Sequence, residues 1–237
     1  MGKKAKTIDE VPLEWCYGDG MVIDMQHKAD FDPITVQNLK NFLTQYNLTI
    51  LPTTIVLIKT GRDRLMGTKD FFKKGTGMSA EATSWLIDQG VRVMGIDQWG
   101  WDLPLPYLIK KAKESNNPEL FWEAHLVGVE KEYCHMEQLT NLDALPYSGF
   151  KVAAFPLKIK GASAGPARVV ALVEKLNQRF ILKDSNFSIK KTYLPRPTFL
   201  TPVLLLELPL ALGAFLAEGL SSFLVVLFPK NLLDIIS

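Results

Sequence analysis

The chain has little cysteine and shows no cysteine motif. Only two of its 237 residues are cysteines, Cys16 and Cys134, and they do not form a Cys-x-x-Cys pair. Two cysteines are too few for a disulfide framework, which excludes the class of small disulfide-stabilised secreted domains. Free cysteines are among the most often buried residues, so we expect both to be buried thiols in a reducing compartment.

The chain also lacks an excess of charge of one sign. Its 27 basic and 25 acidic residues leave a net charge of +2. A nucleic-acid partner is therefore not expected, because binding to phosphates needs a basic surface. The first six residues are basic, but no apolar stretch of the kind found in secretory signals follows them. This pattern predicts a cytoplasmic protein.

Motifs of two large enzyme classes are missing as well. The sequence has no glycine-rich phosphate-binding loop, and neither Ser84 nor Ser163 lies in a nucleophile motif. The chain does contain His125 and Glu137, twelve residues apart. Imidazole nitrogen and carboxylate oxygen together suit a divalent ion such as zinc or manganese. The alternative for His125 is an ordinary partly buried histidine with hydrogen-bond partners.

Apolar runs alternate with helical patterns between residues 20 and 173. Strands are predicted at 21–25, 54–59, 91–96, 150–157 and 167–173, and helices at 35–45, 79–89 and 121–129. Ser79 has the residue type and position of a helix N-cap. Strands alternating with helices predict an α/β domain, and a chain that is 47% hydrophobic can form one substantial core.

Eight short blocks in this region resemble the cyclase family of metal-dependent hydrolases, which includes bacterial kynurenine formamidase and isatin hydrolase. The blocks are residues 7–14, 17–20, 58–61, 77–82, 90–97, 141–145, 155–157 and 165–168, and they occur in family order. The resemblance implies a cyclase-like hydrolase domain over residues 7–173 with the swivelling β/β/α fold. In such enzymes a His and a Glu at this spacing hold one of two metals, and His125 and Glu137 fall on those positions.

The resemblance implies hydrolysis of a small amide, as in an arylformamidase of tryptophan catabolism. It suggests zinc or manganese as cofactor, a small aromatic N-formyl or cyclic amide as substrate, and a homo-oligomer. The family motif His-x-Gly-Thr-His-x-Asp-x-Pro-x-His, which supplies the first metal's ligands and a proton-shuttling His, does not occur in these residues. We therefore expect an N-terminally truncated domain with impaired turnover and an unknown catalytic residue. The alternative is an inactive homologue that acts as a scaffold or binds small molecules.

Four further residues are candidates for a substrate pocket. Asp97 follows the predicted strand 91–96 at its carboxyl end, where α/β sheets commonly present functional groups; a turn carboxylate is the alternative. Trp99 and Trp101 suit an aromatic substrate or a hydrophobic core equally well. Arg168 lies in a block that resembles a family loop near the site, and it could instead form a surface ion pair.

The two other histidines are expected to have lesser roles. His135 precedes Glu137 by two residues, so both would share one face of a strand. The resemblance gives His135 no ligand role, and we expect a position at the surface or behind the ligands. His27 lies in a polar loop and is expected to be solvated.

The sequence changes character after residue 173. A polar connector over 174–200 leads to an apolar stretch, 201–228, that is long enough to span a membrane. Glu207, Pro209 and Glu218 oppose insertion. The alternatives to a membrane span are an apolar tail packed on the domain and sequence translated from beyond the natural end of the gene. We expect a helix, interrupted at Pro209.

Overall fold

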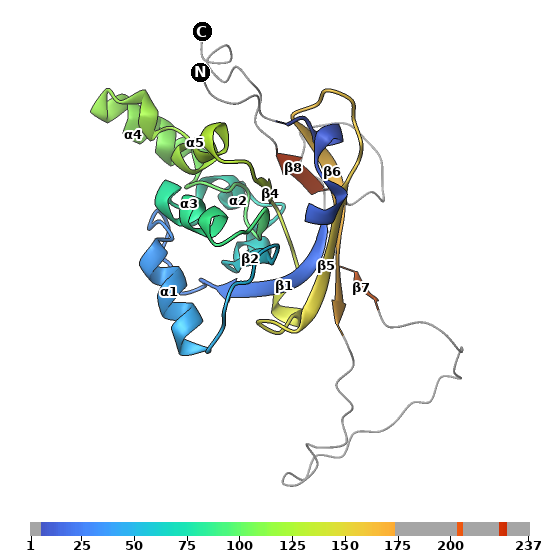
Figure 1. Ribbon diagram of the computed structural model, residues 1–237. Coiled ribbons are helices and arrows are strands. Elements are labelled where there is room, and N and C mark those ends of the chain that lie inside the picture. The colour runs from blue at the N-terminus through green and yellow to red at the C-terminus, as the bar shows by residue number, and fades with distance from the viewer. Residues whose placement is uncertain (1–5, 174–202, 206–222, 227–237) are drawn as a thin grey trace, which may run out of the picture.

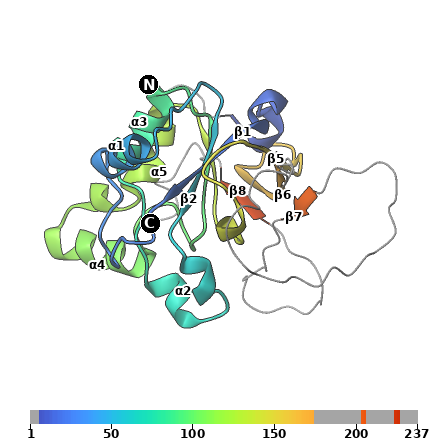
Figure 2. The same ribbon diagram turned by 90° about the horizontal axis from the view of Figure 1, so that it is seen from below.

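The computed structural model describes residues 6–173, 203–205 and 223–226, which form a mixed α/β fold. Four parallel strands lie at its centre: β1 (Tyr17–Asp24), β2 (Ile55–Lys59), β3 (Val93–Ile96) and β4 (Cys134–Met136). The helices gather on one side of them, and the antiparallel strands lie on the other (Figures 1 and 2). The predicted α/β class is therefore confirmed.

The antiparallel strands make the sheet curl. β5 (Phe150–Pro156) pairs with β1, and β6 (Ala164–Val173) pairs with β5. β8 (Phe223–Val226) lies between β4 and β6, and β7 (Val203–Leu205) adds to the other part of β6. Because β6 contacts both β5 and β8, the described strands close on themselves.

In the part of the chain that the structure describes, five α-helices connect or follow the parallel strands. They are α1 (Val36–Gln45), α2 (Lys69–Lys73), α3 (Ala80–Asp88), α4 (Leu105–Ser115) and α5 (Glu123–Glu130). Short 3-10 turns are η1 (Ile8–Glu10), η2 (Leu13–Trp15), η3 (Arg62–Leu65), η4 (Pro118–Leu120) and η5 (Leu142–Ala144). Ser79 caps α3 as predicted, because its hydroxyl accepts a hydrogen bond from the Ala82 N–H at 3.1 Å.

The central strands have apolar side chains on both faces and therefore serve two cores. Val22 and Leu57 pack toward β5 and β6, whereas Ile23 and Ile58 pack toward the helices. Adjacent residues of a strand point to opposite faces, so a continuous apolar run fills both layers. Cys16 and Cys134 are free and buried, as predicted.

β1 begins earlier than the sequence predicted. Residues 17–20, which precede the predicted strand 21–25, are the first half of an eight-residue strand. A Cβ at Gly20 would lie 2.1 Å from the ring of Phe150 on β5, so the glycine makes room for that ring. Glycines that often indicate a turn here permit close packing between two strands.

The predicted helix over 201–228 is wrong for the residues of this range that the structure describes. Residues 203–205 form a strand that pairs with β6. Residues 223–226 form a strand that pairs with both β4 and β6. A strand edge offers unpaired backbone N–H and C=O groups. A short apolar segment can satisfy its own backbone groups by pairing with such an edge instead of forming a helix. The rest of the apolar stretch and the connector 174–200 lie outside the described residues. None of the helices in the described part of the chain has the length and apolar character that a membrane crossing requires.

Candidate metal centre

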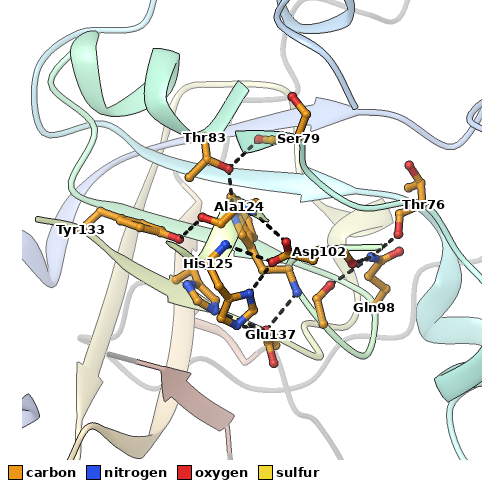
Figure 3. Close-up of polar contacts among 12 residues, drawn as sticks. Thr76, Ser79, Thr83, Gln98, Asp102, Ala124, His125, Tyr133 and Glu137 are labelled. Carbon is orange, nitrogen blue, oxygen red and sulfur yellow. Dashed lines mark hydrogen bonds and ion pairs between the residues drawn. The ribbon is translucent and has the colours of Figure 1, made fainter. Parts of the chain in front are cut away.

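His125 and Glu137 come from neighbouring elements that meet beside α3. His125 lies in the first turn of α5, and Glu137 directly follows β4. Residues 131–133 connect the two elements and bring the chain straight back. His135 and Glu137 stand two positions apart, so their side chains leave the extended chain on the same face. The three side chains come together there, and Figure 3 shows His125 close to Glu137.

The three side chains form a compact, buried group. Glu137 Oε1 lies 3.6 Å from His125 Nε2 and 3.2 Å from His135 Nε2. One ligand atom from each residue lies within 4.8 Å of the others. The exposed fractions are 6% for His125, 0% for His135 and 7% for Glu137. Two imidazoles and a carboxylate in this arrangement have the donor chemistry of a zinc or manganese site.

Asp102 positions His125. Its carboxylate accepts hydrogen bonds from the backbone N–H groups of Ala124 (2.8 Å) and His125 (3.1 Å), and it also contacts His125 Nδ1 (Figure 3). It thereby caps α5, whose N-cap residue Trp122 provides no side-chain hydrogen bond. With Nδ1 directed to Asp102, Nε2 is directed to Glu137. Metal-binding histidines commonly have such a carboxylate partner.

The carboxylates and imidazoles shift one another's protonation. Burial lowers the pKa of His125, but the adjacent Asp102 and Glu137 outweigh this effect, so the pKa is raised. Burial dominates at His135 and lowers its pKa despite the contact with Glu137. Burial raises the pKa of Glu137, yet both histidines and the Trp101 N–H together bring it below its usual value. Glu137 is therefore a carboxylate at neutral pH, ready to bind a cation.

Aromatic rings hold the two imidazoles in place. Trp122 stacks on His125 with ring centroids 4.9 Å apart, and Trp101 stacks on His135 at 5.5 Å. The two imidazoles meet edge to face at 4.6 Å. Trp101 itself is fixed by a hydrogen bond of 3.0 Å from its Nε1 to Thr83 Oγ1. The rings have little freedom to turn, so their nitrogens stay directed into the group.

The structure places the residues predicted for the site in different parts of the fold. His125 and Glu137 lie together. The fully buried Trp101 supports the group from behind, and its backbone N–H donates to Glu137 Oε1 at 2.9 Å. Trp99 is half-buried and packs edge to face on Phe72. Arg168 is exposed on β6, where it lies opposite Phe155.

Of the two positions expected for His135, at the surface or behind the ligands, the surface position is wrong, whereas His27 is exposed as expected. His135 is fully buried because β4 is an interior strand, covered by Trp101 and Tyr133. Asp102 was missed altogether, since a residue so far from His125 in the sequence gives no spacing signal. Asp102 directly follows the Trp99–Trp101 loop, and only the folded structure shows that its carboxylate reaches His125.

Asp97 has the turn role that the sequence left open. Its buried carboxylate accepts hydrogen bonds from Thr60 N (2.7 Å), Thr60 Oγ1 (2.6 Å) and Gly61 N (2.8 Å). These contacts fix the loop that follows β2. Burial raises the pKa of Asp97 from 3.8 to about 6, although the three donors oppose the shift.

This raised pKa predicts a pH dependence of stability. Below about pH 4, Asp97 is protonated in both the folded and the unfolded chain. Between about pH 4 and pH 6, Asp97 loses its proton in the unfolded chain only, so the free energy of unfolding falls as the pH rises. The loss due to Asp97 should be about 3 kcal/mol and complete above the folded pKa. Urea unfolding at several pH values, compared with Asp97→Asn, measures it. An identical pH dependence in both proteins would contradict the assignment.

Gly77 permits the close approach that places Asp102. A Cβ at Gly77 would lie 2.2 Å from the backbone carbon of Asp102 and the nitrogen of Leu103. We expect Gly77→Ala to displace this backbone and to destabilise the fold by about 1–3 kcal/mol or more. Gly100→Ala is the matched control, because its nearest contact would be an ordinary 3.9 Å. Chemical denaturation of both variants should separate them; equal losses would show that the close approach is unimportant.

A cavity of about 530 Å³ lies beside Asp102. Its wall includes Met78, Ser79, Asp102, Leu108 and Lys111. Asp102 contacts His125, but His125, His135 and Glu137 are not among the residues that line the cavity.

Comparisons with known proteins agree with this arrangement. The profile of a family described as "Putative cyclase" matches residues 1–103. Isatin hydrolase A from Labrenzia aggregata, solved with benzyl benzoate bound, is 27% identical with a TM-score of 0.58. The match covers 70% of this chain and 65% of that protein. The resemblance to the cyclase family is confirmed.

Two more structures show the cyclase-type fold. Isatin hydrolase A from Ralstonia solanacearum is 26% identical with a TM-score of 0.58, over 73% of this chain and 66% of its own. A structure titled as a potential metal-dependent hydrolase with cyclase activity is 25% identical with a TM-score of 0.51, over 69% of each chain. The chain spans less than two thirds of the length of either isatin hydrolase. No curated protein sequence matches it significantly.

Proposed function

We propose that residues 7–173 form a metal-dependent hydrolase domain of the cyclase family, with its swivelling β/β/α architecture, acting on small amides. The observation that supports this most is the meeting of His125 and Glu137 in one buried group, with Nε2 and Oε1 3.6 Å apart. Both residues fall on ligand positions of the resembled family. The isatin hydrolases are enzymes of related fold whose name indicates action on a cyclic amide.

The chain's own residues would hold and orient a divalent metal. His125 Nε2 and Glu137 Oε1 are the ligands, Asp102 fixes the imidazole, and the Trp101 N–H fixes the carboxylate. When bound, the metal would polarise an amide carbonyl and make a water molecule more acidic. Zinc or manganese suits the mixed nitrogen and oxygen donors.

The proposed substrate is a small aromatic amide, either an N-formyl amide, as for an arylformamidase, or a cyclic amide. Aromatic rings at the centre support this choice: Phe121 stacks on Trp122, which stacks on His125. Both rings are half-buried, so part of their surface can contact a planar ligand. Turnover is proposed to be slow, because the 237 residues contain no His-x-Gly-Thr-His motif to supply further ligands and a proton-shuttling histidine.

A hydrolysis assay tests this function. Chelator-treated protein, reloaded with zinc or manganese, should slowly hydrolyse an aryl formamide or isatin, and His125→Ala should abolish the reaction. His27→Ala is the control, because His27 is exposed in a different part of the chain. Turnover that survives chelation or the His125 substitution would contradict the proposal. Metal binding without turnover would favour a non-catalytic binding protein.

A further inference from the structure

His135 has a position that the cyclase resemblance does not explain. The resemblance assigns ligand roles to His125 and Glu137 only, yet His135 is the most deeply buried of the three, with an exposed fraction of 0%. Burial of an imidazole has a cost unless its nitrogens gain partners. Its Nε2 faces the same Glu137 oxygen as His125 Nε2 does.

The distances within the group fit one shared ion. In a tetrahedral site with bonds of about 2.0–2.1 Å, two ligand atoms lie about 3.3–3.4 Å apart. Glu137 Oε1 lies 3.2 Å from His135 Nε2 and 3.6 Å from His125 Nε2, on either side of that value. One ligand atom from each of the three residues lies within 4.8 Å of the others, so small side-chain adjustments would complete the geometry.

The ring of His135 is also held in the required orientation. It stacks on Trp101 with ring planes 24° apart and packs against Tyr133 with centroids 5.6 Å apart. His125 packs on it edge to face at 79°, and the Nε2 atoms of both rings lie within 3.6 Å of Glu137 Oε1. A preorganised ring loses little conformational freedom when it binds an ion.

We propose that His135 Nε2 is the third protein ligand of the metal centre. The proposal rests on the metal site of the proposed function and adds a ligand to it. Residues 125–137 would then supply all three protein ligands from one short segment. Three protein ligands and one open position are the usual composition of a catalytic zinc site. The open position would accept a water molecule or a substrate oxygen.

The competing explanation is a structural hydrogen bond. In that case His135 Nε2 carries a proton and donates it to Glu137 Oε1, which also accepts from the Trp101 N–H at 2.9 Å. The two explanations differ in what occupies Nε2 when zinc is added. A ligand nitrogen loses its proton and binds the ion, whereas a hydrogen-bonding nitrogen keeps its proton.

Nitrogen NMR of the histidine side chains distinguishes the two, because the chain contains only three histidines. On addition of one equivalent of zinc to the chelator-treated chain, we expect the Nε2 signals of His125 and His135 to move together and saturate together. The His27 signals should stay unchanged. A His135 spectrum that does not change while that of His125 does would overturn the proposal.

A matched pair of substitutions gives a second test by calorimetric zinc titration. His135→Gln keeps a hydrogen-bond donor but removes the imidazole. We expect zinc affinity to fall by at least about 10–100-fold, because even the loss of a residue that only hydrogen-bonds to a metal ligand has an effect of this size. His27→Gln, the same change at an exposed site, should bind like the parent chain. If the parent chain binds no zinc, the proposed function fails. If it binds zinc and His135→Gln binds equally well, only the third ligand fails. If His135→Gln does not fold, the NMR result on the parent chain decides.

Discussion

Replacing His125 with alanine should reduce zinc affinity by more than about 100-fold, which exceeds the loss typical for an outer partner of a ligand. His125 Nε2 is a ligand atom of the proposed site, and the substitution also separates the metal from Asp102, which contacts Nδ1. Glu137 would keep its contact with His135 but would lose one of its two imidazole neighbours. Competition with a chromophoric chelator measures the change.

The control for this prediction is His27→Ala, which removes an exposed imidazole. It should leave zinc affinity unchanged. Equal affinity of the His125→Ala protein and the parent chain would mean that zinc binds elsewhere, and the metal centre would have to be abandoned.

Replacing Asp102 with alanine should lower the free energy of unfolding by about 3–5 kcal/mol, the usual cost of removing one partner from a buried charged pair. The carboxylate, with an exposed fraction of 6%, binds two backbone N–H groups at the start of α5 and the ring of His125. Alanine leaves all three without their acceptor and removes the helix cap. Urea unfolding gives the difference.

Asp143→Ala is the matched control for Asp102. Asp143 is exposed and pairs with Lys59 and Arg64 at 3.2 and 3.0 Å. Ion pairs of this kind contribute at most about 1 kcal/mol. If both substitutions destabilised the chain equally, Asp102 would have no special role at the start of α5. The conservative Asp102→Asn should retain more stability, since an amide oxygen can still accept from the backbone.

The sequence predicted the parts of this molecule that depend on local pattern. The sequence alone predicts the apolar runs of β2 and β3 and the Ser79 cap of α3, because periodicity and capping depend on neighbouring residues. The antiparallel closure by β6 and β8 is not visible, because strand order depends on contacts between distant segments. The early start of β1 is not visible for the same reason, since the space that Gly18 and Gly20 leave is needed by Thr53 and Phe150.

The candidate site also contains residues that the sequence predicted and residues that only the fold reveals. The pair His125 and Glu137 was found because the resemblance fixes two residues close together in the sequence. Asp102 was missed, although its carboxylate contacts His125 Nδ1, because it reaches α5 from the loop after β3. His135 was assigned a lesser role because the resemblance contains no histidine there. Only burial and the 3.2 Å approach to Glu137 show that it belongs to the group.

An anomalous diffraction measurement at the zinc absorption edge, on a crystal of the chain soaked with zinc, tests the metal centre most directly. The account predicts one strong peak about 2 Å from His125 Nε2 and from Glu137 Oε1, the usual length of zinc bonds to nitrogen and oxygen. The peak should disappear in crystals of His125→Ala. A map without density in this group at saturating zinc, or with its strongest peak at another part of the chain, would contradict the account.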